Sequence, residues 1–250
     1  MKKVWVMLPC YNEEENITPL TEKWFELETQ FSDKGYEMFV VCIDDKSTDR
    51  TAERIQSLTK RFPRCQMLQH KQNKGLGGVL NTSFRYFLEN GTEGDLCVLM
   101  DGDNSHDPIY SLSMLPKIDQ GADVVIASRY CESSEVKGVP SFRQFLSNGA
   151  GIFYKLLLGV KGVKDYTCGY RMYTYEIIRK ARETYGEAIA ERRSFACMME
   201  VLYKLSRIGA KFAEVPFTLR YDWKRGASKM RVFNTVKESV LTAISLRFRS

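Results

Sequence analysis

The order of apolar runs in the first half of the chain constrains its fold more than any other feature. Short apolar runs alternate with longer stretches of helical spacing, which predicts five strands, with a helix after each of the first four. The predicted strands are residues 4–10, 37–43, 66–69, 96–100 and 123–127. Strands that alternate with helices are typical of a mostly parallel sheet with helices on both faces. The sequence therefore predicts an α/β fold.

The second half has a different pattern. A loop over residues 130–140 precedes a helix over 142–158, and a compact polar segment follows at 165–171. We then expect helices over residues 175–185 and 195–208 and a strand over 212–219. A basic loop over 220–229 and a final amphipathic helix over 231–249 follow. With 250 residues, of which 44% are hydrophobic, the chain has material for one domain of ordinary size.

The cysteines and the apolar runs indicate a protein of the cytoplasm. Seven scattered cysteines form no Cys-x-x-Cys pair, and only two histidines are present, which disfavours a zinc site or a disulfide framework. The longest apolar runs are shorter than the roughly 20 residues that a membrane-spanning helix needs. The run from Val4 to Leu8 is also too short for a secretory signal.

Two aspartates directly follow the fourth predicted strand, in the sequence Asp101-Gly102-Asp103. In open α/β sheets, ligands bind in the crevice beyond the carboxyl ends of the strands. Two carboxylates there suit Mg²⁺ or Mn²⁺, held partly by substrate phosphates. The alternative is an ordinary strand-ending turn rich in Asp and Asn. We favour the metal site, because polar clusters also end the neighbouring strands.

The ends of the first two strands offer groups for a nucleoside. Tyr11 can stack on a base, and the carboxylate of Glu13 can accept hydrogen bonds from a ribose. The alternative is a helix N-terminus with Asn12 as its cap. After the second strand, Asp45 can accept a hydrogen bond from a base, whereas Asp49 is better explained as a helix-capping residue.

The segment from Asn73 to Gly78 resembles a phosphate-binding loop and supplies one cation, Lys74. It lacks the full dinucleotide pattern and a Walker lysine, so a dehydrogenase is an alternative for this motif only. Three single arginines lie near predicted strand or helix ends at the same crevice: Arg129, Arg143 and Arg171. A guanidinium matches two phosphate oxygens, although single arginines are more often solvated.

Taken together, these motifs resemble glycosyltransferase family 2, and within it the dolichol-phosphate mannose synthase branch. The resemblance rests on residues 9–14, Asp44-Asp45, 73–77, Asp101-Gly102-Asp103, Ser128-Arg129, 165–171, Glu214-Val215-Pro216 and Ser228-Lys229. It implies a GT-A fold, which is Rossmann-like, a nucleotide-diphosphate sugar donor, a divalent metal and inversion at the anomeric carbon. It also implies one catalytic domain over residues 1–230, divided into a nucleotide-sugar half (1–129) and an acceptor half (130–230), with a separate helix at 231–250.

The resemblance carries roles to individual positions. Asp101 and Asp103 are expected to hold the metal and, with Arg129, to act in catalysis. The residues expected to bind the donor are Pro9, Tyr11, Glu13, Asp45, Lys74 and Asp101. The residues expected to bind the phosphate of the acceptor are Arg143, Arg171 and Lys229. Two positions depart from the branch: Ser105 stands where a glutamine commonly ligates the metal, and Trp223 stands where an arginine is common. Arg220 or Lys224 is the candidate substitute for that arginine.

The expected activity is transfer of a hexose from a GDP- or UDP-sugar to a polyprenyl-phosphate. Such a phosphate is already mostly ionised near neutral pH, whereas a hydroxyl acceptor needs a positioned carboxylate. Asp165 and Glu200 are present, but no adjacent Glu-Asp pair is found, which favours the phosphate acceptor. The alternatives are a transferase with a hydroxyl acceptor in polysaccharide or glycolipid synthesis, a nucleotidyltransferase and a non-catalytic nucleotide-sugar binder.

A net charge of +6 suits phosphate substrates or an anionic membrane surface, and no motif indicates nucleic-acid binding. The final predicted helix has an apolar stripe and three cations: Val232, Val236, Val240 and Ile244, with Lys237, Arg247 and Arg249. This stripe can lie on a membrane, on the core of the protein or on a second copy in a homodimer. A lipid acceptor favours peripheral association with the cytoplasmic face of a membrane.

Overall fold

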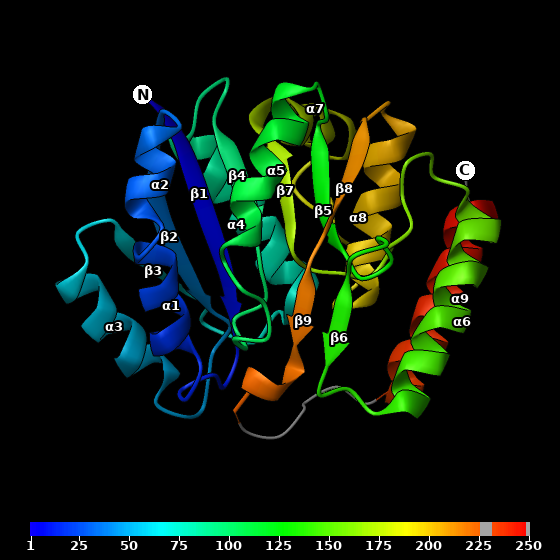
Figure 1. The fold of residues 1–250 in the computed structure, drawn as a ribbon, viewed down its shortest axis with the longest axis horizontal. Coiled ribbons are helices and arrows are strands. Elements are labelled where there is room, and N and C mark those ends of the chain that lie inside the picture. The colour runs from blue at the N-terminus through cyan, green and yellow to red at the C-terminus, as the bar shows by residue number, and fades with distance from the viewer. Residues whose placement is uncertain (226–231, 249–250) are drawn as a thin grey trace.

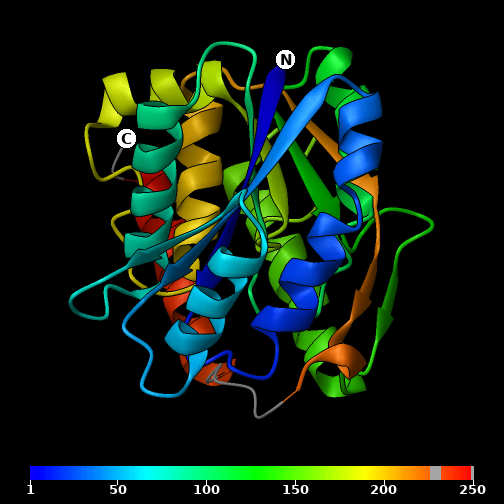
Figure 2. The ribbon, with the colours of Figure 1, turned by 90° about the vertical axis from the view of Figure 1, so that its left-hand side faces the viewer.

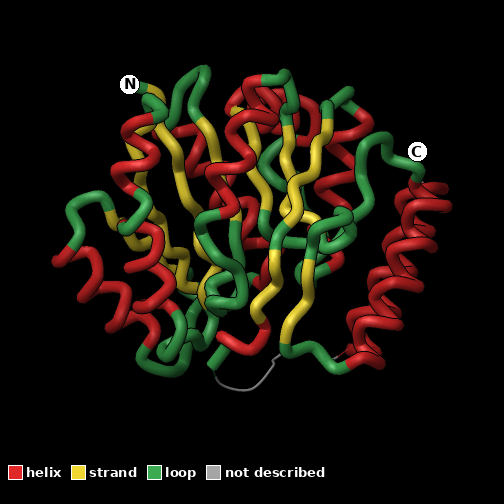
Figure 3. Tube along the Cα trace, viewed as in Figure 1, coloured by secondary structure: helices red, strands yellow, loops and turns green. Residues whose placement is uncertain are grey.

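A computed structural model describes residues 1–225 and 232–248, with the backbone only at 141–148 and 232–236. Its main sheet has the strand order β3-β2-β1-β4-β7-β5-β8 (Figures 1 and 3). Every strand of this sheet is parallel to its neighbours except β7, which is antiparallel to β4 and β5. The bounds are β1 (Lys2–Cys10), β2 (Tyr36–Asp44), β3 (Cys65–Gln69), β4 (Leu96–Leu99), β5 (Val124–Ser128), β7 (Arg171–Thr174) and β8 (Phe212–Pro216). The predicted α/β fold is therefore confirmed.

Helices cover both faces of the sheet (Figure 2). On one face lie α1 (Ile17–Phe25), α2 (Glu28–Asp33), α3 (Thr51–Arg61) and α5 (Tyr110–Asp119). On the other, α4 (Gly75–Asn90) packs against β1, α7 (Tyr175–Tyr185) and α8 (Ala196–Arg207). Beyond α8 lie α9 (Val232–Phe248) and α6 (Ser141–Leu158), which pack on each other. The predicted domain boundary at residue 230 falls outside the described residues.

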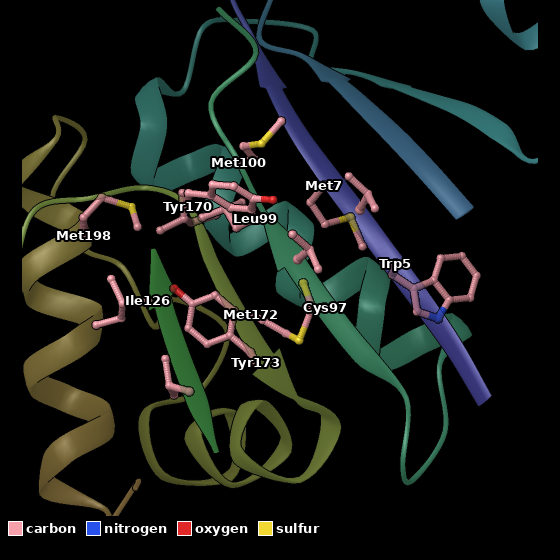
Figure 4. Packing of buried hydrophobic residues seen from close by; sticks show 14 of the residues in the cluster. Trp5, Met7, Cys97, Leu99, Met100, Ile126, Tyr170, Met172, Tyr173 and Met198 are labelled. Carbon is pink, nitrogen blue, oxygen red and sulfur yellow. The ribbon is translucent and has the colours of Figure 1, made fainter. Parts of the chain in front are cut away.

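The central strands are apolar on both faces because helices cover both sides of them. Residues 4–8 are at most 3% exposed, and residues 40–43 are fully buried. Figure 4 shows Met7, Leu99 and Met172 from three neighbouring strands among the packed side chains. This core fixes the ends of the strands, from which the candidate site is built.

Four elements differ from the sequence prediction. The helix predicted over 15–29 is two helices, α1 and α2. The strand predicted over 212–219 is divided, because β8 pairs with β5 in the main sheet whereas β9 (Thr218–Arg220) pairs outside it. Strand β7 was not predicted, and neither was β6 (Glu135–Lys137), which pairs with β9 in a small second sheet. Both are too short for an alternating pattern to stand out.

Candidate active site

The carboxyl ends of β1, β2 and β4 meet at one edge of the sheet. The backbone N–H of Asp45, just past β2, donates to the Cys10 carbonyl at 2.8 Å. Past β4, a Cβ atom on Gly102 would lie 2.5 Å from the Pro9 carbonyl oxygen, so only glycine permits this approach. The turns after the three strands are therefore in contact, as the sequence predicted.

The turn after β1 is bound to the turn after β2. Asn12, at φ 55°, accepts a hydrogen bond from the Thr48 N–H at 2.8 Å, and its own N–H donates to Ser47 Oγ at 2.9 Å. Helix α1 begins later, at Ile17, so the interpretation of Asn12 as a helix cap is wrong. Tyr11 is 41% exposed in this turn, which leaves its ring accessible to a ligand.

Asp45 anchors the start of α4. Its buried carboxylate accepts hydrogen bonds from the N–H groups of Lys74 and Gly75, both at 2.8 Å, and contacts His70 Nδ1 at 2.7 Å. His70 Nε2 in turn contacts Thr82 Oγ1 on α4 at 2.9 Å. Asp45 thus positions the predicted phosphate-binding loop. The predicted contact of Asp45 with a nucleotide base stays a prediction. Sequence reasoning missed His70, although histidines are rare in this chain.

The glycines of this loop make room for another part of the chain. A Cβ atom on Gly77 would lie 1.9 Å from the Arg192 carbonyl oxygen, and one on Gly75 would lie 2.5 Å from that of Arg193. Arg193 also donates to the Asn73 carbonyl at 2.7 Å. The segment at 191–193 is held by Glu200, which accepts the Arg192 N–H at 2.9 Å. Close packing therefore explains Gly75 and Gly77, and phosphate binding by this loop stays a prediction.

Asp101 and Asp103 lie in the turn after β4, and they differ in their partners. Asp103 Oδ1 accepts hydrogen bonds from Ser105 Oγ at 2.5 Å and Ser105 N at 3.1 Å, and its Oδ2 accepts one from Lys224 Nζ at 2.6 Å. Among the described residues, no hydrogen bond to the carboxylate of Asp101 is formed. A Cβ atom on Gly169 would lie 2.8 Å from Asp101 Oδ1, so glycine leaves room for this carboxylate.

The electrostatics of the pair suit a divalent cation. Burial and the neighbouring charge of Asp103 raise the pKa of Asp101 to about 7. Burial alone would raise the pKa of Asp103 too, but Lys224 and His106 hold it below its ordinary value of 3.8. Two carboxylates supply hard oxygen ligands, so they fit Mg²⁺ or Mn²⁺ that takes its remaining ligands from substrate phosphates and water. Within the described residues, no group of three acidic, His or Cys side chains is close enough together to hold a metal ion.

Arg129, at the carboxyl end of β5, is fixed by a buried partner. Its Nε and Nη2 donate to the two oxygens of Asp165 at 2.8 and 2.7 Å, and Nη2 also donates to Thr167 Oγ1 at 2.6 Å. Burial would raise the pKa of Asp165, but the Arg129 guanidinium lowers it to about 2. The guanidinium is therefore held in place at this edge of the sheet.

Arg171, a predicted acceptor-binding residue, pairs with Leu99 at the carboxyl end of β4, but its side chain is buried. Arg171 is 1% exposed within β7, and it donates to the carbonyls of Met198 and Tyr166 at 2.7 and 2.9 Å. This burial does not fit a phosphate-binding role, and Arg171 instead ties β7 to its surroundings. Lys229 and the side chain of Arg143 lie outside the described residues.

The segment after β9 contacts the turn that carries Asp101 and Asp103. The Arg220 N–H donates to the Ser105 carbonyl at 2.9 Å, while the Arg220 side chain pairs with Asp222. Lys224 reaches Asp103, as described above. Of the two candidate substitutes for the arginine of the branch, Lys224 is therefore the one that contacts the predicted metal ligands.

A mostly parallel sheet with one antiparallel strand, and an Asp-Gly-Asp turn beyond its fourth strand, define a protein of the GT-A class. The profile of Glycosyl transferase family 2 matches residues 5–182, and the chain belongs to this family as a glycosyltransferase.

Curated relatives agree with this assignment, and a solved structure shares the fold. The chain is 30% identical over 230 residues to the dolichol-phosphate mannosyltransferase of Pyrococcus furiosus, covering 92% of this chain and 59% of the relative. It is 30% identical over 228 residues to the undecaprenyl-phosphate mannosyltransferase of Micrococcus luteus, covering 91% and 87%. A glucosyl-3-phosphoglycerate synthase of Mycobacterium tuberculosis, solved with Mn²⁺ and UDP, has the same fold, with a TM-score of 0.68 at 18% identity over 99% of this chain and 79% of that one.

Proposed function

We propose that the enzyme transfers a hexose, with inversion, from a nucleotide-diphosphate sugar to a polyprenyl-phosphate. One observation carries the proposal: the Asp101–Asp103 pair lies at the carboxyl ends of the strands, beside the turn that carries the exposed Tyr11. Arg129 lies at the same edge of the sheet, after β5. The names of the relatives, which specify mannosyl transfer to dolichol or undecaprenyl phosphate, support the acceptor class. The donor is a GDP- or UDP-hexose.

On the donor side, Tyr11 stacks on the base, and Pro9 and Glu13 complete the nucleoside contacts. Lys74 is exposed beside this region and provides a cation for the diphosphate. Asp101 and Asp103 hold Mg²⁺ or Mn²⁺, which stabilises the negative charge that develops on the leaving diphosphate. Arg129, already oriented by Asp165, stabilises charge on a phosphate of the donor or acceptor.

On the acceptor side, the chemistry needs no strong general base. An ionised phosphate oxygen of the acceptor forms a bond to the anomeric carbon, and the bond from that carbon to the diphosphate oxygen breaks, with its electron pair leaving on the nucleoside diphosphate. The two carboxylates considered for a hydroxyl acceptor are already bound: Asp165 pairs with Arg129, and Glu200 accepts the N–H groups of Glu191 and Arg192. This favours the phosphate acceptor over a hydroxyl.

An apolar surface on α6 and α9 supports attachment to a membrane. Among described residues, large apolar side chains are exposed here on Ile152, Phe153, Leu156, Leu241, Ile244 and Phe248. The side of α9 packed inward carries small residues instead, Ser239, Thr242 and Ala243. Lys155 and Arg247 are exposed on the same two helices, so apolar and cationic groups alternate as at a membrane interface. None of the described helices is long and apolar enough to cross a membrane.

A transfer assay tests the proposal. Purified enzyme is incubated with Mn²⁺, each of several labelled GDP- and UDP-hexoses, and either a polyprenyl-phosphate or a glycolipid with a free sugar hydroxyl. Label in a lipid product whose linkage is cleaved by mild acid, from one donor, is the expected result. Transfer to the hydroxyl acceptor alone would support the alternative and contradict the phosphate acceptor.

A further inference from the structure

Both carboxylate oxygens of Asp103 are already bound within the chain. Oδ1 takes two hydrogen bonds from Ser105, and Oδ2 takes the ammonium of Lys224 at 2.6 Å. The side chains of Asp103 and Lys224 are only 16% and 12% exposed, which strengthens their attraction. A divalent cation such as Mg²⁺ binds a carboxylate oxygen at about 2.0–2.1 Å. If it binds Asp103 through Oδ2, it lies beside this ammonium, and the two positive charges repel each other in a site with little solvent.

The segment that carries Lys224 is fixed at several points. Asn16 forms two hydrogen bonds with the backbone of Arg225, each of 3.0 Å. The ring of Trp223 contacts the Lys23 ammonium, 3.8 Å from the ring centre, and the Arg220 guanidinium, 4.3 Å from it. Lys23 Nζ also donates to Asn104 Oδ1 at 3.2 Å. Lys224 is therefore brought to Asp103 by an anchored segment, and not by the free rotation of one long side chain.

We infer that Lys224 is the resident cation of the metal site, which the divalent ion displaces when it binds. The inference rests on the proposed metal-dependent function. It explains how Asp103 is neutralised before metal arrives, and it gives the displaced ammonium a new partner in the donor diphosphate. Without nucleotide, the metal must compete with the Lys224 ammonium for Asp103. When a nucleoside diphosphate is also bound, the displaced ammonium pairs with it, and the metal binds more tightly. Their binding is therefore cooperative.

Binding of Mn²⁺ to the full chain, measured by electron paramagnetic resonance without nucleotide, tests this. Lys224→Met should bind Mn²⁺ about tenfold more tightly than wild type, because a charge-assisted hydrogen bond no longer competes. Addition of GDP or UDP should increase the Mn²⁺ affinity of wild type by a larger factor than that of Lys224→Met. Equal Mn²⁺ affinity of the two proteins, or weaker binding by the variant, would overturn the inference.

Two variants separate displacement from a simple change of charge. Asn16→Ala keeps every charge but removes the clamp on Arg225, so it should also bind Mn²⁺ more tightly, by about threefold. Lys137→Met removes a lysine charge on β6 that pairs with Glu135, and it should bind Mn²⁺ as wild type does. An unchanged affinity in Asn16→Ala, or an equal gain in Lys137→Met, would show that charge alone matters and overturn the role of the segment.

Asp103→Asn distinguishes failure of this inference from failure of the proposed function. If it binds Mn²⁺ as tightly as wild type, Asp103 is not a ligand, and the metal site and the inference are both wrong. If it loses Mn²⁺ while Lys224→Met gains nothing, the metal site stands and only the role of Lys224 is wrong. Thermal melting of each variant checks that its fold is retained.

Discussion

The guanidinium of Arg129 makes a two-point contact with the carboxylate of Asp165, at 2.8 and 2.7 Å, and Asp165 is fully buried. Asp165 lies in the segment that precedes β7, so a residue from the second half of the chain orients the arginine at the end of β5. An oriented donor stabilises a developing charge without reorganisation during the reaction.

Replacement of Asp165 should therefore affect both stability and activity. In Asp165→Asn, the half-buried arginine keeps its charge but loses its charged partner, so the free energy of unfolding should fall by about 3 kcal/mol. Turnover should fall by about tenfold or more, because the guanidinium is no longer fixed. Urea unfolding and the transfer assay measure the two effects. Thr167→Val, which removes a single hydrogen bond to Arg129, is the control and should cost less than about 1.5 kcal/mol. Equal effects of the two substitutions would contradict this account.

His106 should make stability depend on pH. It is 5% exposed and stacks on Phe217, and burial lowers its pKa from 6.5 to about 4. His106 thus binds a proton less readily in the folded chain than in the unfolded chain. The stability that neutral His106 allows is present above pH 6.5 and is lost as the pH falls toward 4. Between pH 7.5 and 5 the wild type should lose about 2 kcal/mol more than His106→Gln in urea unfolding. Parallel losses in the two proteins would rule out His106 as the cause.

Gly77 should tolerate no side chain. A Cβ atom there would lie 1.9 Å from the Arg192 carbonyl oxygen, and backbone cannot move away cheaply. Gly77→Ala should lower the free energy of unfolding by about 2 kcal/mol and weaken donor binding, since α4 shifts away from Asp45. Gly149→Ala on α6 is the matched control, because nothing lies within 4 Å of the added Cβ atom. The control should stabilise the protein by up to about 1 kcal/mol. Similar stability of both variants would show that the close contact at Gly77 is unimportant.

The apolar surface on α6 and α9 should bind membranes. Leu156→Glu and Phe248→Glu place charges on residues that are 82% and 77% exposed, so folding should be unaffected. Co-sedimentation with anionic liposomes should decrease in both variants. Ile109→Glu, at an exposed apolar residue away from these helices, should sediment like wild type. Unchanged sedimentation of the two helix variants, or a concentration-dependent dimer that they disrupt, would assign the surface to something other than a membrane.

The sheet could be predicted because its strands are continuous apolar runs, buried on both faces as parallel strands are. The aspartates after β4 could also be placed, since strand ends meet at one edge. The burial of Arg171 could not be predicted, because a charged side chain is seldom fully buried and its partners are backbone carbonyls, which no sequence pattern marks. The Lys224–Asp103 contact joins residues 121 positions apart, so only the folded chain reveals it.

The most direct test of the central claim is metal-dependent transfer of labelled hexose to a polyprenyl-phosphate by wild type and by Asp101→Asn. Asp101 is chosen because, among the described residues, no hydrogen bond to its carboxylate would be lost. The account predicts labelled lipid from the wild type with Mn²⁺, none with EDTA, and a loss of at least about a hundredfold in a folded Asp101→Asn. Full transfer in EDTA, or by the variant, would contradict it.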